Sequence, residues 1–161
     1  MGDYTFDTFL DEHLSVAQNK TGYRFSIDAV ILAAYARKYP ADLIVDLGTG
    51  CGIIPLILAY REPNLKIFGI ELQKELADIA SSNVKENHMG STITILRKDL
   101  KELKNDMISG PVDLILSNPP YRKAESGRIN PDIQRALARH EITVCLEDIT
   151  QTVFGIHHVI A

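Results

Sequence analysis

Residues 43–52 read Leu-Ile-Val-Asp-Leu-Gly-Thr-Gly-Cys-Gly, an apolar run that passes directly into a glycine-rich turn. The run 43–47 is typical of a buried parallel strand. An apolar, helical stretch from Ile53 to Tyr60 follows the turn. Strand, glycine loop and helix in this order place backbone N–H groups beside a ligand at the start of a helix. We therefore expect bare amides in the loop 48–52.

The spacing of the loop glycines and the acid before them indicate the kind of ligand. Gly48, Gly50 and Gly52 form Gly-x-Gly-x-Gly, one residue shorter than the dinucleotide fingerprint. Asp46, at the strand tip, would repel a pyrophosphate but could accept a hydrogen bond from the ammonium of an amino acid. The loop favours an amino-acid-bearing nucleoside over NAD, and a glycine turn without a ligand is the alternative.

Two further predicted strands also lead to acids. Residues 66–71 end in Glu71, which lies 25 residues beyond Asp46, and an acid in that position typically holds ribose hydroxyls. Residues 93–97 lead to Asp99, which could accept from the exocyclic amine of adenine. The alternative for Asp99 is a helix N-cap. Acids at three successive strand tips, with glycines after the first, favour a ligand site.

Asn118-Pro119-Pro120-Tyr121 follows the apolar run 112–116, at the carboxyl end of a fourth predicted strand. The two prolines fix the backbone and leave a rigid carbonyl beside the Asn118 side-chain oxygen. Two such acceptors suit a planar NH2 group, and Tyr121 offers a face for stacking. The motif indicates a site for a planar amine such as that of adenine; a proline-rich turn with a surface tyrosine is the alternative.

Alternating strands and helices predict an α/β fold with a doubly wound, mainly parallel sheet. We expect a single domain over 1–161, with N-terminal helices in 1–40, a Rossmann-like core in 41–153 and an atypical tail in 154–161. Residues 7–16 are predicted to form the first helix. Ser26 is expected to cap the second, Pro40 to stop it, and its apolar stripe comprises Ile27, Val30, Ile31 and Ala34. Another helix after Glu71, ended by Gly90, has the stripe Leu76, Ile79, Ala80 and Val84.

Composition fits a globular intracellular protein. The chain has 161 residues, of which 45% are hydrophobic and 24% charged, values that are ordinary for one domain. Cys51 and Cys145 have no paired spacing, so neither a zinc site nor a disulfide framework is predicted. Neither a signal peptide nor an apolar stretch long enough to span a membrane is evident. We expect a cytoplasmic protein without a metal or a membrane partner.

Charge is unevenly distributed. The net charge is −4, which argues against a generic nucleic-acid binder. Residues 122–140, however, hold two acids, Glu125 and Asp132, against five basic residues: Arg122, Lys123, Arg128, Arg135 and Arg139. A basic segment beside the predicted amine site favours contact with phosphates. A solvated loop with scattered charges is the alternative.

These motifs resemble those of class I S-adenosylmethionine-dependent methyltransferases that methylate amines. Residues 21–33, Thr-Gly-Tyr-Arg-Phe-Ser-Ile-Asp-Ala-Val-Ile-Leu-Ala, and 138–141, Ala-Arg-His-Glu, narrow the resemblance. Within the small-domain methyltransferase group they are similar to the bacterial valine-tRNA adenine-N6 methyltransferase family. The resemblance covers roughly residues 23–148 and implies the strand order 3-2-1-4.

The resemblance implies S-adenosylmethionine as cofactor and a role for each matching residue. Glu71 would hold its ribose and Asp99 its adenine, while Phe25 and Asp28 would close the pocket. The methionine end and the loop would involve Asp46, Gly48, Thr49, Gly50 and Gly52. The catalytic residues would be Asn118, Pro119, Pro120 and Tyr121, with Asn118 also at the cofactor. The RNA contacts would be Arg122, Lys123, Arg128 and Arg139.

The implied reaction is methyl transfer to an exocyclic amine, with adenine N6 in tRNA or other RNA preferred. Protein glutamine N5 and DNA adenine N6 are the alternatives. The tail 154–161 does not resemble the family's continuation, so the far-side strands would be missing. Strand 112–117 would then be an exposed edge through which the chain could self-associate. A non-catalytic remnant that binds the cofactor is the alternative from another class.

Overall fold

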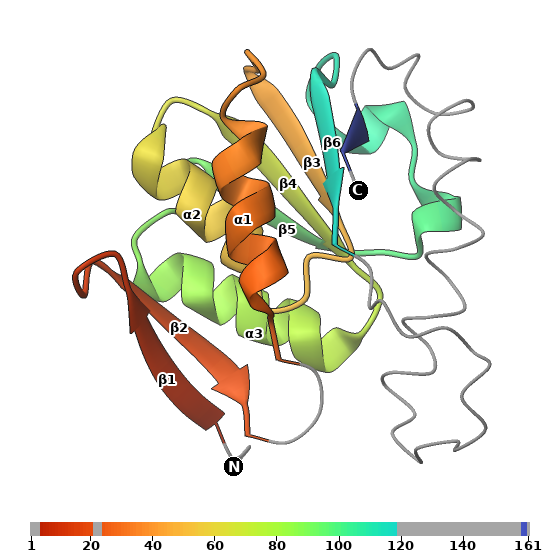
Figure 1. Cartoon of the computed structure of the whole chain (residues 1–161). Helices are drawn as coiled ribbons and strands as arrows, with labels where there is room; N and C mark the ends of the chain where they lie inside the picture. Colours follow the sequence, from red (N-terminus) through yellow and green to blue (C-terminus); the bar gives the residue numbers. More distant parts are fainter. Residues whose placement is uncertain (1–3, 21–23, 119–158, 161) are drawn as a thin grey trace, which may run out of the picture.

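A parallel sheet forms the centre of the computed structural model, which describes residues 4–20, 24–118 and 159–160. Its strand order is β5-β4-β3-β6-β7, and every neighbouring pair is parallel. The bounds are β3 Leu43–Leu47, β4 Lys66–Glu71, β5 Ile93–Arg97, β6 Leu114–Ser117 and β7 Val159–Ile160. The predicted order 3-2-1-4 is confirmed by β5-β4-β3-β6 (Figure 1).

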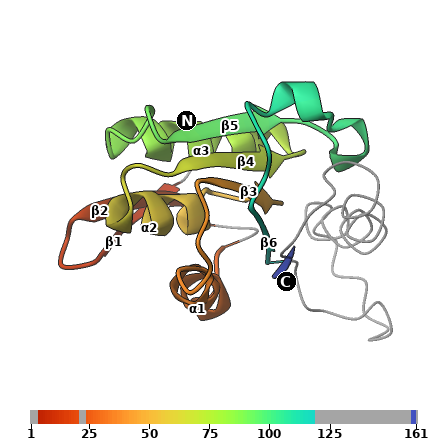
Figure 2. The same cartoon turned by 90° about the horizontal axis from the view of Figure 1, so that it is seen from above.

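Both faces of the sheet are covered, as an all-parallel sheet requires. Helices α1 (Ile27–Ala36), α2 (Ile53–Arg61) and α3 (Lys74–Glu86) share one apolar core with alternate strand residues, among them Ile44 and Ile67. The intervening strand residues, Val45 and Phe68 among them, pack on the other face with the segment around the 3-10 turns Leu100–Glu102 and Asn105–Met107. Figure 2 shows α3 on the β5 side of this sheet and α1 on the β6 side.

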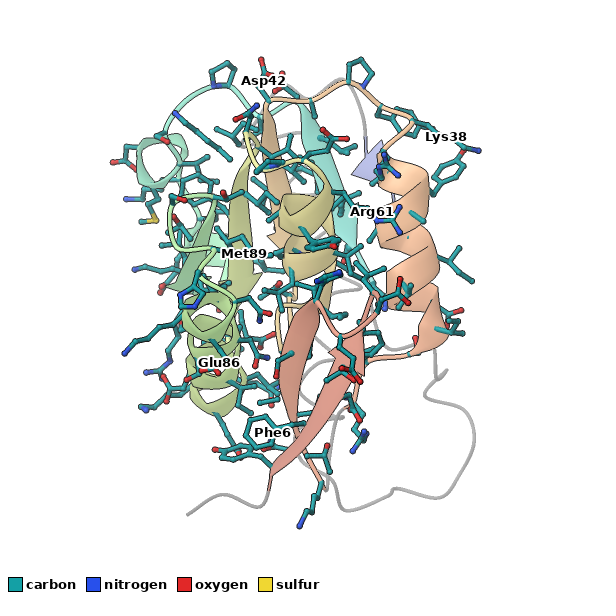
Figure 3. The ribbon with its side chains drawn as sticks, turned by 90° about the vertical axis from the view of Figure 1, so that its left-hand side faces the viewer. Phe6, Lys38, Asp42, Arg61, Glu86 and Met89 are labelled. Atoms are coloured by element: carbon teal, nitrogen blue, oxygen red, sulfur yellow. The ribbon has the colours of Figure 1, made fainter. Side chains whose placement is uncertain are left out.

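The N-terminal segment is an antiparallel hairpin of β1 (Tyr4–Phe9) and β2 (Leu14–Asn19). Our prediction of a helix over 7–16 is therefore wrong. Alternate residues of β2, including Leu14 and Val16, are buried, so the apolar pattern has the period of a strand. The chain reverses at residues 10–12, all three of which have positive φ. Figure 3 places the hairpin, with Phe6, at the end of the molecule opposite Asp42.

Helix α1 forms where predicted but turns a different face inward. Its buried residues are Ala29, Ala33 and Ala36, whereas Ile27 and Ile31 are 68% and 59% exposed. The predicted apolar stripe is wrong at Ile27, Ile31 and Ala34, which are exposed, because the small alanine face packs against the core that α2 contributes to. Of the predicted stripe, Val30 is partly buried against that core. Ser26 occupies the N-cap position, but its side chain caps no backbone amide.

Helix α3 buries the predicted stripe of Leu76, Ile79, Ala80 and Val84. Its predicted stop at Gly90 is wrong, because the left-handed residue that ends the helix is His88, with a φ of 57°. The Met89 amide donates to the Val84 carbonyl at 2.9 Å, which is the closing bond of a Schellman motif.

Strand β6 has neighbours on both sides. Ile115 and Leu116 pair with Val159 and Ile160 of β7, while the other edge of β6 pairs with β3. The predicted exposed edge along 112–117 is therefore wrong at Ile115 and Leu116, which are fully buried. Self-association stays a prediction, but the exposed edge of β6 on which it was based is not present at these two residues. Among the helices described, none has the length and apolarity needed to cross a membrane.

Candidate functional site

The predicted site residues gather where the central strands end. Because β4, β3 and β6 are adjacent and parallel, their carboxyl ends lie at one edge of the sheet (Figure 1). The strand bounds place Asp46, Glu71 and Asn118 at these ends. In the register, Leu47 pairs with Ile70 on one side and with Ser117 on the other. Open α/β sheets bind ligands at this carboxyl edge.

Asp46 is a buried acid that has no hydrogen-bond partner among the described residues. Its side chain is fully buried, and neither carboxylate oxygen accepts a hydrogen bond within the part of the chain that the structure describes. Burial raises the pKa of Asp46 to about 7, the nearby Thr49 hydroxyl lowers it, and the charge of Glu71 raises it. The Thr49 hydroxyl is buried and likewise lacks a hydrogen-bond partner there. Such orphaned polar atoms are rare and indicate an absent ligand or water.

The glycine loop does not present the bare amides that we predicted. The N–H groups of Gly48 and Thr49 donate to the Ile70 carbonyl at 2.9 and 3.0 Å, and the Gly52 N–H donates to the Thr49 carbonyl at 2.9 Å. The Gly50 N–H donates to Glu71 Oε2 at 3.0 Å. The loop is therefore bound to β4 and to itself, so the prediction is wrong for these four amides.

Glu71 holds the loop and the start of α3 together. Its Oε1 accepts from the Gln73 N–H at 2.9 Å, while Oε2 accepts from Gly50, and the residue is only 6% exposed. Each carboxylate oxygen can accept more than one hydrogen bond. The bonds to Gly50 and Gln73 therefore do not by themselves exclude the role predicted for Glu71, which is to accept from a ribose hydroxyl.

Asp99 and Asn118 occupy the expected strand tips. Asp99 lies two residues beyond β5 and is half-buried, and its carbonyl accepts from the Glu102 N–H at 3.0 Å. Asn118 follows β6 and is buried. The preceding Ser117 donates from its hydroxyl to the Leu47 carbonyl at 3.2 Å, which fixes the end of β6 against β3.

Phe25 and Asp28 lie just before and within α1. The Phe25 ring packs against Phe9 with centroids 5.1 Å apart, and its N–H donates to Gln18 Oε1 at 3.2 Å. Asp28 is exposed and accepts from the Ser26 hydroxyl at 3.2 Å. The structure therefore ties Phe25 to the hairpin and leaves Asp28 at the surface.

The remaining predicted residues lie outside the described ranges. These are the rest of the catalytic motif and the predicted RNA contacts: Pro119, Pro120, Tyr121, Arg122, Lys123, Arg128 and Arg139.

A buried polar cluster next to the loop was missed by the sequence reasoning. It comprises Gln18 and Asn19 at the end of β2 and Asn83 of α3. Asn83 donates to the Cys51 carbonyl in the glycine loop at 2.9 Å, and Asn19 donates to Glu75 Oε1 at 3.1 Å. An available signal was the position of Asn83 within the apolar stripe of α3, since a buried amide must find partners.

Three further observations concern other groups and cavities that could bind or react with a ligand. Burial raises the pKa of the Cys51 thiol to about 12, which makes it a poor nucleophile. The described residues contain no cluster of side chains suited to a metal ion. A cavity of about 280 Å³ lined by Arg37, Asp42 and Glu62 lies at the amino end of β3, away from the carboxyl edge.

Comparison with protein families shows to which family the chain belongs. The model of the methyltransferase small domain matches residues 24–143, which include the glycine loop and the Asn118 motif. The chain belongs to the methyltransferase small-domain family. Its solved structural neighbours include an S-adenosylmethionine-dependent O-methyltransferase from Thermotoga maritima, with 25% identity and a TM-score of 0.50 over 62% of this chain and 37% of that one.

Curated relatives of this methyltransferase small domain include two named tRNA1(Val) (adenine(37)-N6)-methyltransferase. The protein from Porphyromonas gingivalis ATCC 33277 is 36% identical over 149 residues, covering 89% of this chain and 58% of the relative. The one from Proteus mirabilis HI4320 is 37% identical over 121 residues, covering 74% of this chain and 46% of the relative. The chain thus spans about half the length of these relatives, 58% of the first and 46% of the second.

Proposed function

We propose that this chain binds S-adenosylmethionine at the carboxyl edge of its sheet and transfers the methyl group to an exocyclic amine. The observation that carries the proposal is the buried Asp46 carboxylate, which has no partner among the described residues. The cofactor has an ammonium group at its methionine end, and such a cation would satisfy this carboxylate. Glu71 would accept from the ribose hydroxyls and Asp99 from the adenine amine.

Asn118 would bind and orient the acceptor amine. Its side-chain oxygen and the Pro119 carbonyl would each accept one N–H, which directs the nitrogen lone pair toward the cofactor, while Tyr121 would stack on the base. When bound, S-adenosylmethionine supplies a methyl group on a sulfonium, so a C–N bond forms as the C–S bond breaks and its electron pair stays on sulfur. The amine proton then leaves to water, and no general base is required.

Adenine N6 in tRNA is the acceptor that we propose. The relatives' names refer to that substrate, and the basic segment 122–140 favours a phosphate-bearing partner over protein. Calorimetry with S-adenosylhomocysteine tests cofactor binding, and no heat from folded protein would refute it. A labelled-methyl assay on tRNA, DNA and protein fractions then identifies the acceptor. Label in protein glutamine alone, or in DNA alone, would contradict the tRNA proposal.

A cofactor-binding chain without catalysis is the second candidate. Asp46 and Glu71 would hold the cofactor at β3 and β4, whereas Asn118 beyond β6 would hold the acceptor, so binding of the cofactor does not require methyl transfer. Binding of S-adenosylhomocysteine together with no label in any fraction would support this candidate over the enzyme.

A further inference from the structure

Asn83 of α3 and Asn87, the residue that caps the C-terminus of that helix, bind the backbone of β2 along its outer edge, as a further strand would. Asn83 Oδ1 accepts from the Ala17 N–H at 2.8 Å, and its Nδ2 donates to the Ala17 carbonyl at 3.0 Å. Asn87, one turn further, makes the same pair with Ser15, at 3.0 Å for the N–H and 2.7 Å for the carbonyl. Each side-chain amide therefore satisfies one backbone N–H and one carbonyl of the hairpin. In Figure 3 the hairpin lies alongside α3.

Of the two asparagines, Asn83 also bonds to the glycine loop. Its Nδ2 donates a second hydrogen bond, to the Cys51 carbonyl at 2.9 Å, and the residue is only 2% exposed. The second donor of Asn87 goes instead to the Asn83 carbonyl within α3, at 2.7 Å. The asparagines thus have equivalent bonds to the hairpin and differ in their contact with the loop.

The Cys51–Gly52 peptide lies where α3 approaches the loop. Gly52 has a φ of 84°, and a Cβ built on it would be 3.3 Å from the Ala80 Cβ. Ala80 and Asn83 are three residues apart and so share one face of α3. The loop amides before this peptide are held by β4, through Ile70 and Glu71. The direction of the Cys51 carbonyl is therefore set from α3, by Asn83.

We propose that Asn83 is a positioning residue for the cofactor loop. It fixes the Cys51–Gly52 peptide, and because the same amide is bound to Ala17, the hairpin holds Asn83 in the orientation that the loop needs. Cofactor affinity should then depend on Asn83 and not on Asn87. The predicted effect on cofactor affinity rests on the proposed function. The effect of Asn83 on the loop does not, because it is present in the ligand-free protein.

The test compares Asn83→Asp with Asn87→Asp, each of which keeps the size and an acceptor oxygen and loses the NH2 donors. Urea denaturation, amide hydrogen exchange of the ligand-free protein and calorimetry with S-adenosylhomocysteine are measured on all three proteins. Both variants should lose stability, Asn83→Asp by more because its carboxylate would be buried. Asn83→Asp alone should speed exchange at Gly50 and Gly52 and raise the Kd about tenfold, the loss expected for one hydrogen bond.

Equal effects of the two variants on the Kd and on loop exchange, or no effect of either, would overturn the inference. If the unmodified protein binds no cofactor, the proposed function fails, and exchange at Gly50 and Gly52 in the ligand-free variants still decides the role of Asn83. Should Asn83→Asp fail to fold, Asn83→Ala is compared with Asn87→Ala. That pair places no oxygen against the Cys51 carbonyl and is judged by the same measurements.

Discussion

The Glu71 carboxylate and the Gly50 backbone amide are joined by a buried hydrogen bond of 3.0 Å between Oε2 and N. The acid at the tip of β4 therefore shapes the glycine loop that follows β3 before any ligand is present. Because the other oxygen accepts from Gln73, the same side chain also fixes the chain entering α3. A residue assigned to the ribose by resemblance thus has a structural role in this chain.

That double role predicts that Glu71→Ala destabilises the ligand-free protein. The buried Gly50 amide and the partly buried Gln73 amide lose their acceptor, and an unsatisfied buried donor costs about 1–3 kcal/mol. Asp28→Ala, which removes an exposed acid also assigned to the cofactor, is the control and should change stability by less than about 0.5 kcal/mol. Urea denaturation without ligand measures both, and equal stability of the two variants would contradict the role given to Glu71.

Asp46→Asn should change the pH dependence of stability. Burial raises the folded pKa of Asp46 from 3.8 to about 7, so the unfolded chain releases this proton first as the pH rises. The stability that the neutral carboxyl contributes is present below pH 3.8 and is lost as the pH rises to about 7. A shift of this size corresponds to at most about 4 kcal/mol.

Because asparagine does not titrate, the melting temperature of Asp46→Asn relative to the unmodified protein should rise between pH 4 and pH 8 in the absence of ligand. The slope is the quantity to compare, since a buried NH2 group has its own cost that does not vary with pH. A difference in melting temperature that stays constant across this range would rule out a raised pKa at Asp46.

Gly52→Ala should destabilise the protein, and Gly90→Ala should not. Gly52 has a φ of 84°, and its Cβ would press on Ala80 at 3.3 Å, whereas nothing lies within 4 Å of a Cβ at Gly90. A left-handed conformation costs an L-residue about 1–2 kcal/mol. Replacing a glycine at a compatible site is neutral or stabilises by up to about 1 kcal/mol. Denaturant midpoints of both variants provide the measurement, and a neutral Gly52→Ala would show that the loop can relax.

The orientation of α1 can be tested on its two faces. Ala33 is fully buried, so Ala33→Leu should overpack the core and cost about 1–3 kcal/mol. Ile31 is 59% exposed, so Ile31→Ser should change stability by less than about 0.5 kcal/mol. If the stripe predicted from sequence were the buried face, Ile31→Ser would instead destabilise the protein strongly. A loss of stability in Ile31→Ser as large as that in Ala33→Leu would support the buried face that the sequence predicted.

Strands β3 to β6 of the sheet were predictable from sequence because their signals are local, whereas the pairing of β7 with β6 was not predicted. Each apolar run is bounded by a glycine, an acid or the Asn-Pro-Pro motif, and strands buried on both faces need no particular periodicity. The same reasoning failed for the hairpin, whose short strands alternate faces over only a few residues. The reasoning also failed for the buried face of α1, although the helix itself was predicted. The pattern gave more weight to the bulky isoleucines than to the alanines, yet small residues allow closer packing.

The positions of the acids in the site could be predicted from sequence, but its hydrogen bonds could not. Asp46 and Glu71 could be placed because strand tips meet at one edge of a parallel sheet. Whether a loop amide faces a ligand or a carbonyl depends on the neighbouring strand, here on Ile70. Asn83 bonds to Ala17 and Cys51, 66 and 32 residues away in sequence. The burial of Asn83 could be inferred from its place in the stripe of α3, but its partners could not, because contacts over such separations leave no pattern within a single segment.

Asn118→Ala should abolish methyl transfer and leave cofactor binding in place. In the proposed reaction the side-chain oxygen of Asn118 accepts an N–H of the acceptor amine, so its loss removes orientation of the lone pair in the transition state. Loss of one such positioned acceptor costs about 10²–10³ in turnover by analogy with other preorganised polar groups. Asp46, Glu71 and the glycine loop are unchanged, so the Kd for S-adenosylhomocysteine should stay within about twofold.

The measurement combines calorimetry with a labelled-methyl assay on tRNA at saturating cofactor. Ser117→Ala is the matched control, because its hydroxyl bonds to the Leu47 carbonyl beside Asn118 and contacts no reacting group in the proposal. It should lower stability by about 1 kcal/mol and retain most of the turnover once folded. Equal turnover of Asn118→Ala and the unmodified protein would refute the role of Asn118. A parallel loss of cofactor binding would instead assign Asn118 to the cofactor, because catalysis and binding would then fail together.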